Sequence, residues 1–511
     1  MIKEFLTVFS QLIETAQTVT VLNDDNETAR QTVKLYSSLT EDEKVFFFDI
    51  VKSFGDQGDE YRLYFEYLCL HLYKDKRFAD DILDCLLTFD MDTDRKHNYY
   101  MVLGRELFVA GISADYSKSV MLEEMLVEEI ISKADILLER RSYNDRDIGS
   151  VVIVIKPFLG EFHSPTLQTI NLDNYLRKLG YRTFYISYCD NEILRKYAND
   201  VCAPFTRSEL FTGIGKFEYD CFGMKVEGLH FDLRADSMVD DINALAVHIS
   251  QINPEFVVGI EGGNILADIC TKFTDVITMN VVDDLPVTVA GSVLRYFPGE
   301  YRNRYLRAGE YNKTVFDAAY DNELMPYNND GEKIKLTPGK FHVCIMGNRL
   351  DDELNDDMLN IVRTLAESVP ETDMVFIGNC PKTEDKLSDI KDRCRFLGYV
   401  ERCEDAVGAC SMFLNPPRTG GGGGGYMAIK RGVPVYTLKD CDVASCVGKE
   451  FEHDSFDELI PFVRKCIDDK DYYDNMRHVS EENYRKRYHI DSIGNIRAFC
   501  DRYKEYICDH N

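Results

Sequence analysis

The most informative segment of the chain is 411-SMFLNPPRTGGGGGGYMAIKRGVPVYTL-438. A short apolar run comes before six consecutive glycines, and a second apolar run follows Gly432. Between them, Tyr426 to Arg431 has a helical pattern that stops at Gly432. A strand, a Gly-rich turn and a helix in this order offer free backbone N–H groups and a positive helix end, which together hold a phosphate. A flexible linker is the alternative, but linkers seldom lie between two core strands.

Length and charge limit the function classes. The chain has 511 residues, which indicates about three domains. With 59 Lys and Arg against 88 Asp and Glu the net charge is −29, which disfavours nucleic-acid and anionic-membrane partners. Apolar stretches such as 151-VVIVI-155 fall far short of the ~20 residues of a membrane span, and the N-terminus lacks the features of a signal peptide. We therefore expect a cytoplasmic protein with no transmembrane segment, in which the 16 scattered cysteines are reduced and structural.

The N-terminal part of the sequence is helical in pattern. Apolar residues from Ile2 to Ile13 recur at three- and four-residue spacing, and Thr40 to Glu43 forms a capping box. The polar segment 142–150 indicates a linker. We predict an all-helical domain over residues 1–149.

Two α/β domains are predicted to follow. Short apolar strands alternate with helices that end in glycine, which is the pattern of βαβ units in a parallel sheet. The first domain is placed at 150–330 and the second, after a polar gap at 326–340, at 331–490, with a C-terminal helix at 491–511 that packs back on the body. The expected strands are 151–155, 183–188, 256–260, 341–346, 374–377, 395–399, 411–414 and 434–438. Two Rossmann-like domains that face each other form a ligand cleft at the carboxyl ends of their strands.

The glycine run and its flanks resemble a known signature. N-P-P-R-T-G-G-G followed by A-I-x-x-G-V-P-V-Y-T-L is similar to the donor-binding motif of GT-B-fold glycosyltransferases. The similarity is nearest to the branch with bacterial adhesin-modifying protein N-glycosyltransferases and O-GlcNAc transferases. Gly347 to Leu350 resembles the G-x-R-L turn of that family, and 398-GYV-400 resembles its base-stacking turn. The resemblance implies an α/β chain with the GT-B fold, two Rossmann-like domains facing across a cleft, preceded by an all-α domain.

The resemblance also implies a donor site. The alternative for its two arginines is that each forms an ion pair with a nearby acidic side chain at the surface. The expected diphosphate ligands are Asn348, Arg349, Arg418, Thr419, Gly420, Gly421, Gly422, Gly423, Gly424 and Gly425. The expected base and ribose contacts are Tyr399, Val400 and Asp442.

The sequence departs from the family pattern at two points. No acidic residue lies between Arg418 and Val433, so the glutamate pair of many retaining enzymes is missing and an inverting mechanism is favoured. Met427 stands where a ribose-binding carboxylate is often found, and Asp442 is a candidate to replace it.

The acceptor side has two candidate features. His163, in the loop after the first strand, is the candidate general base, because imidazole titrates near neutral pH. Its ring could instead only bond neighbouring backbone ahead of the helix. Gly262 and Gly263 either contact sugar or acceptor or allow close packing of strand and helix.

These features predict a metal- and cofactor-independent glycosyltransferase. A nucleoside-diphosphate sugar, expected to be a UDP-sugar, would give a hexosyl or N-acetylhexosaminyl group to a protein, peptide or glycan acceptor. A homo-oligomer and a hetero-partner both stay open. One alternative is a catalytically silent GT-B-like binding or chaperone subunit of a protein-glycosylation complex; another is a sugar-nucleotide epimerase.

Overall fold

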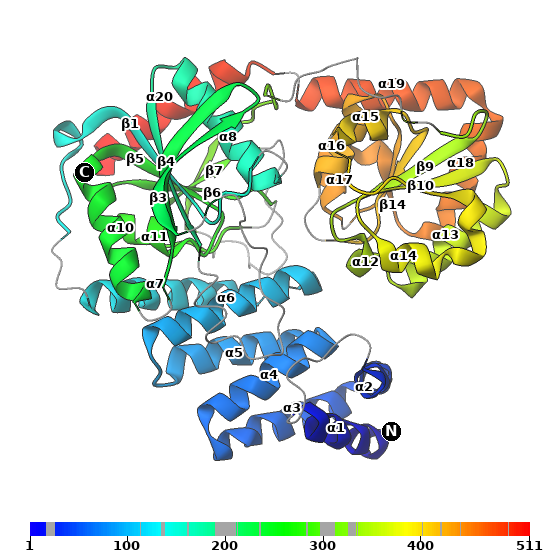
Figure 1. Ribbon diagram of the computed structural model, residues 1–511, viewed down its shortest axis with the longest axis horizontal. Coiled ribbons are helices and arrows are strands. Elements are labelled where there is room, and N and C mark those ends of the chain that lie inside the picture. The colour runs from blue at the N-terminus through cyan, green and yellow to red at the C-terminus, as the bar shows by residue number, and fades with distance from the viewer. Residues whose placement is uncertain are drawn as a thin grey trace. The chain divides into compact units, whose positions relative to one another are not determined.

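The computed structural model describes residues 1–16, 26–112, 114–133, 138–160, 163–189, 211, 213–234, 237–282, 285–296, 312–324, 334, 336–400, 402–418, 422–439, 441–488 and 490–510 (Figure 1). The chain forms two compact units. Unit 1 comprises Met1–Arg295, Tyr301–Phe316 and Phe499–Asn511, and unit 2 comprises Tyr296–Glu300 and Asp317–Ala498.

The N-terminal part of unit 1 is helical, as the sequence predicts. The capping box forms at Thr40, whose hydroxyl accepts from the N–H of Glu43 while the Glu43 carboxylate accepts from the N–H of Thr40. The helices are α1 Ile2–Ala16, α2 Glu27–Ser37, α3 Glu41–Ser53, η1 Phe54–Gln57, α4 Asp59–Tyr73, α5 Lys76–Thr88, α6 Thr93–Ala110 and α7 Tyr116–Lys133.

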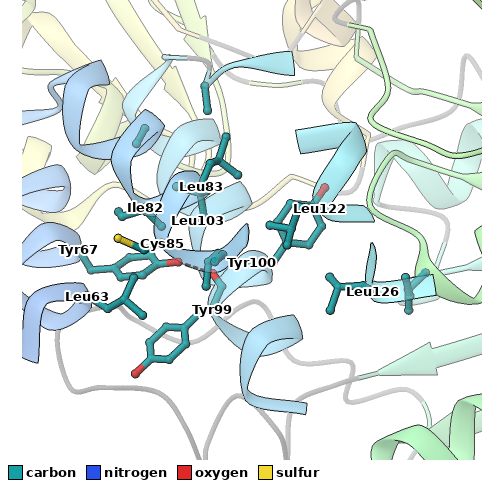
Figure 2. Packing of buried hydrophobic residues seen from close by; sticks show 14 of the residues in the cluster. Leu63, Tyr67, Ile82, Leu83, Cys85, Tyr99, Tyr100, Leu103, Leu122 and Leu126 are labelled. Atoms are coloured by element: carbon teal, nitrogen blue, oxygen red, sulfur yellow. Dashed lines mark hydrogen bonds between the residues drawn. The ribbon is translucent and has the colours of Figure 1, made fainter. Parts of the chain in front are cut away.

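A buried apolar cluster holds these helices together. Figure 2 shows side chains of α4, α5, α6 and α7 that pack on one another, and the Tyr67 hydroxyl donates to the Tyr99 carbonyl at 2.5 Å. The same cluster continues into the α/β part of unit 1 through residues such as Val152 and Val257. The helical region and the first sheet therefore share one core, and burial of apolar surface stabilises both together.

The segment predicted as a linker, 142–150, is instead built into unit 1. It contains η2, Tyr143–Asp145, and the start of β1, Asp147–Ile155. Arg146 is buried and its Nη1 donates to Asp275 Oδ2 at 2.6 Å and to the Glu255 carbonyl at 3.0 Å. The polarity of this segment reflects a buried ion pair, which sequence composition does not distinguish from a solvated linker.

The sheet of unit 1 has the strand order β3-β4-β2-β1-β5-β6-β7-β8 among the described residues. β1 pairs in parallel with β2 and β5, and its apolar run is buried from Val151 to Ile155. The expected strands 151–155, 183–188 and 256–260 all form. The elements are β1, β2 Arg182–Cys189, β3 Ile214–Cys221, β4 Met224–Asp232, β5 Pro254–Ile260, β6 Val276–Met279, β7 Ser292–Arg295, β8 Thr314–Asp317, α8 Ser164–Lys178, α10 Met238–Ile252 and α11 Ile265–Cys270.

The β3–β4 hairpin was missed by the sequence analysis. It pairs antiparallel from Ile214 opposite Phe231 to Cys221 opposite Met224. Its polar residues alternate with buried ones on an edge of the sheet, so it lacks the continuous apolar run of the central strands.

Unit 2 contains a parallel sheet with the order β11-β10-β9-β12-β13-β14, surrounded by helices (Figure 1). All five strands expected in this part of the sequence form. The strands are β9 Phe341–Met346, β10 Thr372–Ile377, β11 Cys394–Phe396, β12 Met412–Leu414, β13 Val435–Leu438 and β14 Glu452–His453. The helices are α12 Leu350–Glu353, α13 Asp356–Ser368, α14 Pro381–Lys386, η3 Ser388–Arg393, α15 Cys403–Gly408, α16 Gly422–Lys430, α17 Asp442–Val447, η4 Lys449–Phe451, η5 Phe456–Glu458, α18 Leu459–Asp468 and α19 Lys470–Arg487.

The C-terminal helix α20, Ser492–His510, has different packing partners along its length. In unit 2, Ser492 Oγ accepts from the N–H of Asp321 at 3.0 Å. In unit 1, the ring of Tyr503 packs edge-on against Phe256 and Phe316.

No helix in the described part of the chain is long and apolar enough to cross a membrane. The cysteines within these residues are free, and most of them are buried, as expected of structural thiols.

Candidate functional site

The glycine run begins a helix earlier than the sequence suggests. α16 starts at Gly422, whereas the sequence pattern predicted its start at Tyr426. Glycine costs about 1 kcal/mol in a helix interior relative to alanine, so local preference argues against this start. Packing of the glycines against their surroundings offsets that cost. Thr419, Gly420 and Gly421 lie outside the described residues.

The four described glycines divide into two kinds. A Cβ on Gly424 would lie 2.7 Å from Phe413 Cζ, and a Cβ on Gly425 would lie 2.5 Å from Val443 Cγ1, so both are glycines because α16 packs closely on β12 and α17. Gly423 is exposed, and nothing lies within 4 Å of a Cβ built on it. Gly422 is half-buried. Only the first glycines of α16 thus offer backbone that a ligand could approach.

Two arginines meet at one carboxylate beside this helix. Arg418 Nη1 lies 3.0 Å from Glu353 Oε2, and Arg349 Nη2 lies 3.1 Å from Glu353 Oε1. Arg418 also donates through Nε to Asn415 Oδ1 at 3.0 Å. Its side chain is 4% exposed, whereas that of Arg349 is 34% exposed. Arg418 is therefore held in place, and Arg349 is the arginine that solvent can reach.

Gly347 makes room for this arrangement. A Cβ on Gly347 would lie 2.7 Å from Arg418 Nη1 and 3.0 Å from Glu353 Oε2. Asn348, the next residue, is exposed. Arg349 follows β9 and Arg418 follows β12, and these strands are parallel neighbours, so both residues lie at the carboxyl edge of the sheet.

The predicted base and ribose residues lie at the same edge. Tyr399 follows β11 and is 56% exposed, and the preceding Gly398 has a positive φ of 64°. Val400 is half-buried against the core of unit 2. Asp442 is the first residue of α17, after β13. An exposed tyrosine at the carboxyl edge is a suitable platform for an aromatic base.

In unit 1, His163 lies at the corresponding edge of the other sheet. It is the N-cap residue of α8, and its Nδ1 is 3.1 Å from Thr166 Oγ1. The Thr166 hydroxyl also accepts from the N–H of Leu159 at 3.1 Å, which ties the loop to the helix. Burial lowers the pKa of His163 to about 4. The imidazole is therefore neutral at pH 7 but a weaker base than the sequence analysis assumed.

The glycine pair after β5 is fixed by packing. A Cβ on Gly262 would lie 2.7 Å from the Val287 nitrogen, and the N–H of Gly263 donates to the Val287 carbonyl at 2.8 Å. Close approach of the segment at Pro286 and Val287 thus accounts for Gly262. A contact of this pair with sugar or acceptor stays a prediction.

Glu261, directly before this pair, is a residue that the sequence analysis did not assign. Its backbone is left-handed, with φ 67°, and the residue is half-buried at the carboxyl end of β5. Burial raises the pKa of its carboxyl to about 7, although an N–H bond from Val281 acts in the opposite direction. The sequence signal was a carboxylate before two glycines, but neither the backbone conformation nor the burial can be read from it.

A group of possible metal ligands in the helical region already has its cations. Glu66, Asp81 and Cys85 bring ligand atoms within 4.8 Å of one another. Arg62 bonds both carboxylates, and Lys52 Nζ lies 2.9 Å from Asp81 Oδ1. These ion pairs neutralise the carboxylates, so the cluster fits a structural network.

Two α/β parts with mainly parallel sheets, the first of which shares its core with an N-terminal helical region, define the GT-B fold in this chain. Among solved structures, a variant of O-GlcNAc transferase from Thermobaculum terrenum aligns with a TM-score of 0.50 and 12% identity, over 99% of this chain and 98% of that chain. HepE from Anabaena in complex with UDP aligns at 0.46 and 12% identity, over 70% of this chain and 100% of that chain. A glycosyltransferase from Rickettsia africae aligns at 0.46 and 11% identity, over 70% of this chain and 98% of that chain. Protein-family models and curated proteins give no match to the sequence.

Proposed function

We propose that the protein is a glycosyltransferase that uses a UDP-sugar and gives its sugar to a protein, peptide or glycan acceptor. The observation that carries this proposal is the convergence of Arg349 and Arg418 on Glu353 at the carboxyl edge of the sheet in unit 2. A diphosphate needs cationic donors and free N–H groups, and this edge of the sheet offers both in a strongly acidic chain.

The donor site is proposed on unit 2. Arg349 exchanges its bond to Glu353 for one to the diphosphate. The buried Arg418 keeps its bonds to Glu353 and Asn415 and contributes positive charge to the site. The backbone N–H groups at Gly422 and Gly423 contact the phosphate oxygens, and Tyr399 stacks on the base. Asp442, the first residue of α17, is proposed to bind the ribose hydroxyls.

The chemistry is proposed to be inverting and free of metal. The departing diphosphate gains negative charge as the bond to the sugar breaks, and the guanidinium and the helix end stabilise that charge in the transition state. The acceptor is proposed to bind on unit 1, at the edge of the sheet where the neutral imidazole of His163 lies. Resemblance to the adhesin-modifying and O-GlcNAc transferase branch supports a protein acceptor.

UDP binding tests the donor site. We expect UDP to raise the melting temperature of the wild-type protein, and Arg349→Ala to weaken UDP binding about 10- to 100-fold, because a charge-assisted bond contributes about 1.5–3 kcal/mol. Arg464→Ala is the matched control: Arg464 is 39% exposed and lies 3.2 Å from Glu371, which precedes β10 at the opposite edge of the same sheet. Absence of UDP binding in the wild type would instead favour a silent binding subunit.

A further inference from the structure

The turn after β5 holds Glu261 in a conformation that side chains rarely adopt. Its φ of 67° is left-handed, which costs a residue with a Cβ about 1–2 kcal/mol. Glycine, which adopts this conformation freely, occupies the next two positions, yet a glutamate stands at the strained one. Strain of this kind collects at functional sites, where the surrounding structure maintains it.

The surrounding contacts fix the direction of this turn. The N–H of Glu261 donates to the Met279 carbonyl at 2.9 Å, which extends the pairing of β5 with β6. The turn continues through Gly262 and Gly263, which pack directly on the backbone of Val287. Two neighbouring segments, β6 and the stretch at Val287, thus hold the backbone of this turn in place, as the support of a reacting group requires.

The turn lies beside the loop of the predicted base. Val154 of β1 is paired with Gly259 of β5 in a parallel register, so both strands leave the sheet at the same edge. His163 lies in the segment after β1, and Glu261 comes directly after β5. Asp268 on the helix that follows this turn is engaged elsewhere, because its carboxylate accepts from the Thr288 hydroxyl at 2.5 Å.

We propose that Glu261 is the acid/base residue of this chain, and that its carboxylate takes the proton of the attacking acceptor group. This inference rests on the proposed function. The acceptor oxygen or nitrogen forms a bond to the anomeric carbon of the UDP-sugar, the bond from that carbon to the diphosphate oxygen breaks, and UDP leaves with the electron pair. The acceptor proton moves to Glu261, which later releases it to water, so no oxidant or further co-reactant is needed.

The proton affinities of the two candidates support this assignment. A general base works best when its pKa lies near the working pH. Burial brings the pKa of Glu261 to about 7 and that of His163 to about 4. The histidine then positions the acceptor, and the glutamate holds the proton.

Release of UDP from UDP-glucose, UDP-galactose and UDP-N-acetylglucosamine, with water as acceptor, tests the inference in the 511-residue chain. We expect Glu261→Gln to lower the rate by 100-fold or more while UDP affinity stays within twofold of wild type. Glu255→Gln is the matched control, because Glu255 is a buried carboxylate on the same strand at its opposite end, where it accepts from the Tyr143 hydroxyl at 2.6 Å. The wild-type rate should rise with pH around 7, and this rise should persist in His163→Ala.

Glu261→Gly separates a catalytic role from a structural one. Glycine relieves the left-handed strain, so this variant should melt at a higher temperature and still lack turnover. A Glu261→Gly protein as active as wild type would overturn the inference and leave the proposed function standing. If the wild type binds no UDP and releases none from any donor, the proposed function itself fails. UDP binding by the wild type without turnover of any donor would contradict the proposed transfer and the assignment of Glu261 together, whereas turnover that Glu261→Gln leaves unchanged would contradict the assignment alone.

Discussion

Nη1 of Arg418 lies 3.0 Å from Oε2 of Glu353, although 65 positions separate the two residues in the chain. The bond joins the loop after β12 to the short helix after β9, and Arg349 contacts the other oxygen of the same carboxylate. Glu353 therefore supplies the negative charge that faces both arginines at the point where a diphosphate is proposed to bind.

Glu353→Gln tests this relationship. The amide keeps the shape of the carboxylate but removes its charge, so the buried Arg418 loses its ionic partner and the free energy of unfolding should fall by about 1–3 kcal/mol. UDP should bind several-fold more tightly, because its diphosphate no longer competes with Glu353 for Arg349. Chemical denaturation and titration calorimetry measure both effects.

Glu371→Gln is the control for that experiment, since Glu371 pairs with Arg464 at the surface and its loss should change stability by less than about 0.5 kcal/mol. Unchanged UDP affinity in Glu353→Gln would show that the carboxylate and the diphosphate do not share Arg349.

Two adjacent glycines of α16 should respond to alanine in opposite ways. Gly424→Ala places a methyl group 2.7 Å from the ring of Phe413, which is fully buried, so we expect a loss of about 1–3 kcal/mol. Gly423→Ala meets open space and should stabilise the helix by up to about 1 kcal/mol. Urea unfolding of the two variants gives both values. A diphosphate bound at the amino end of α16 further requires that Gly423→Ala weaken UDP binding.

The buried carboxyls Glu123 and Asp268 should make unit 1 less stable as the pH rises. Burial raises the pKa of Glu123 well above its ordinary value and that of Asp268 to about 6. The folded chain then binds these protons more tightly than the unfolded chain, so their contribution is fully present below about pH 4 and is lost as the pH rises through the folded pKa values.

Glu123→Gln should therefore raise the free energy of unfolding by at least about 1 kcal/mol at pH 8 and change it little at pH 4.5. Glu128→Gln on the same helix is the control, because Glu128 is 67% exposed and pairs with Lys272. Equal effects of Glu123→Gln at both pH values would be inconsistent with a buried protonated carboxyl.

His163 should remain neutral from pH 5.5 upward. Burial lowers its pKa to about 4, so its ring carbon resonances in NMR spectra should not move between pH 5.5 and 8. The resonance is assigned by its loss in His163→Asn. A midpoint near 6.5 would place the imidazole in water and restore it as a base of ordinary strength.

Much of the fold is legible in the sequence. The run at Val151 to Ile155 is continuous and β-branched, which predicts a strand buried on both faces, and that strand forms at the centre of its sheet. The helical region and the strands of unit 2 also follow from periodicity. The structures of segment 142–150 and of the β3–β4 hairpin could not be predicted in this way. The first contains the buried ion-paired Arg146 and the second contains an edge strand, and both are polar in sequence.

For the candidate site, the sequence predicts which positions lie near the diphosphate but not how their side chains are arranged. The glycine run and the turn at Gly347 indicate where a diphosphate would bind, since their positions after buried strands follow from local pattern alone. The sequence could not indicate that Arg418 is buried and Arg349 accessible. That difference depends on how each arginine packs around Glu353 once β9 and β12 lie side by side.

The alternation of strands and helices, and the place of the glycine run between two core strands, follow from local pattern, because the periodicity of apolar residues is a local property. Tertiary structure alone decided which glycines are packed and which are open, and it alone placed Glu261 in a left-handed turn. Those outcomes depend on contacts with Phe413, Met279 and Val287, which are far from the affected residues in the chain or on other elements. Their energies arise only when these elements pack together.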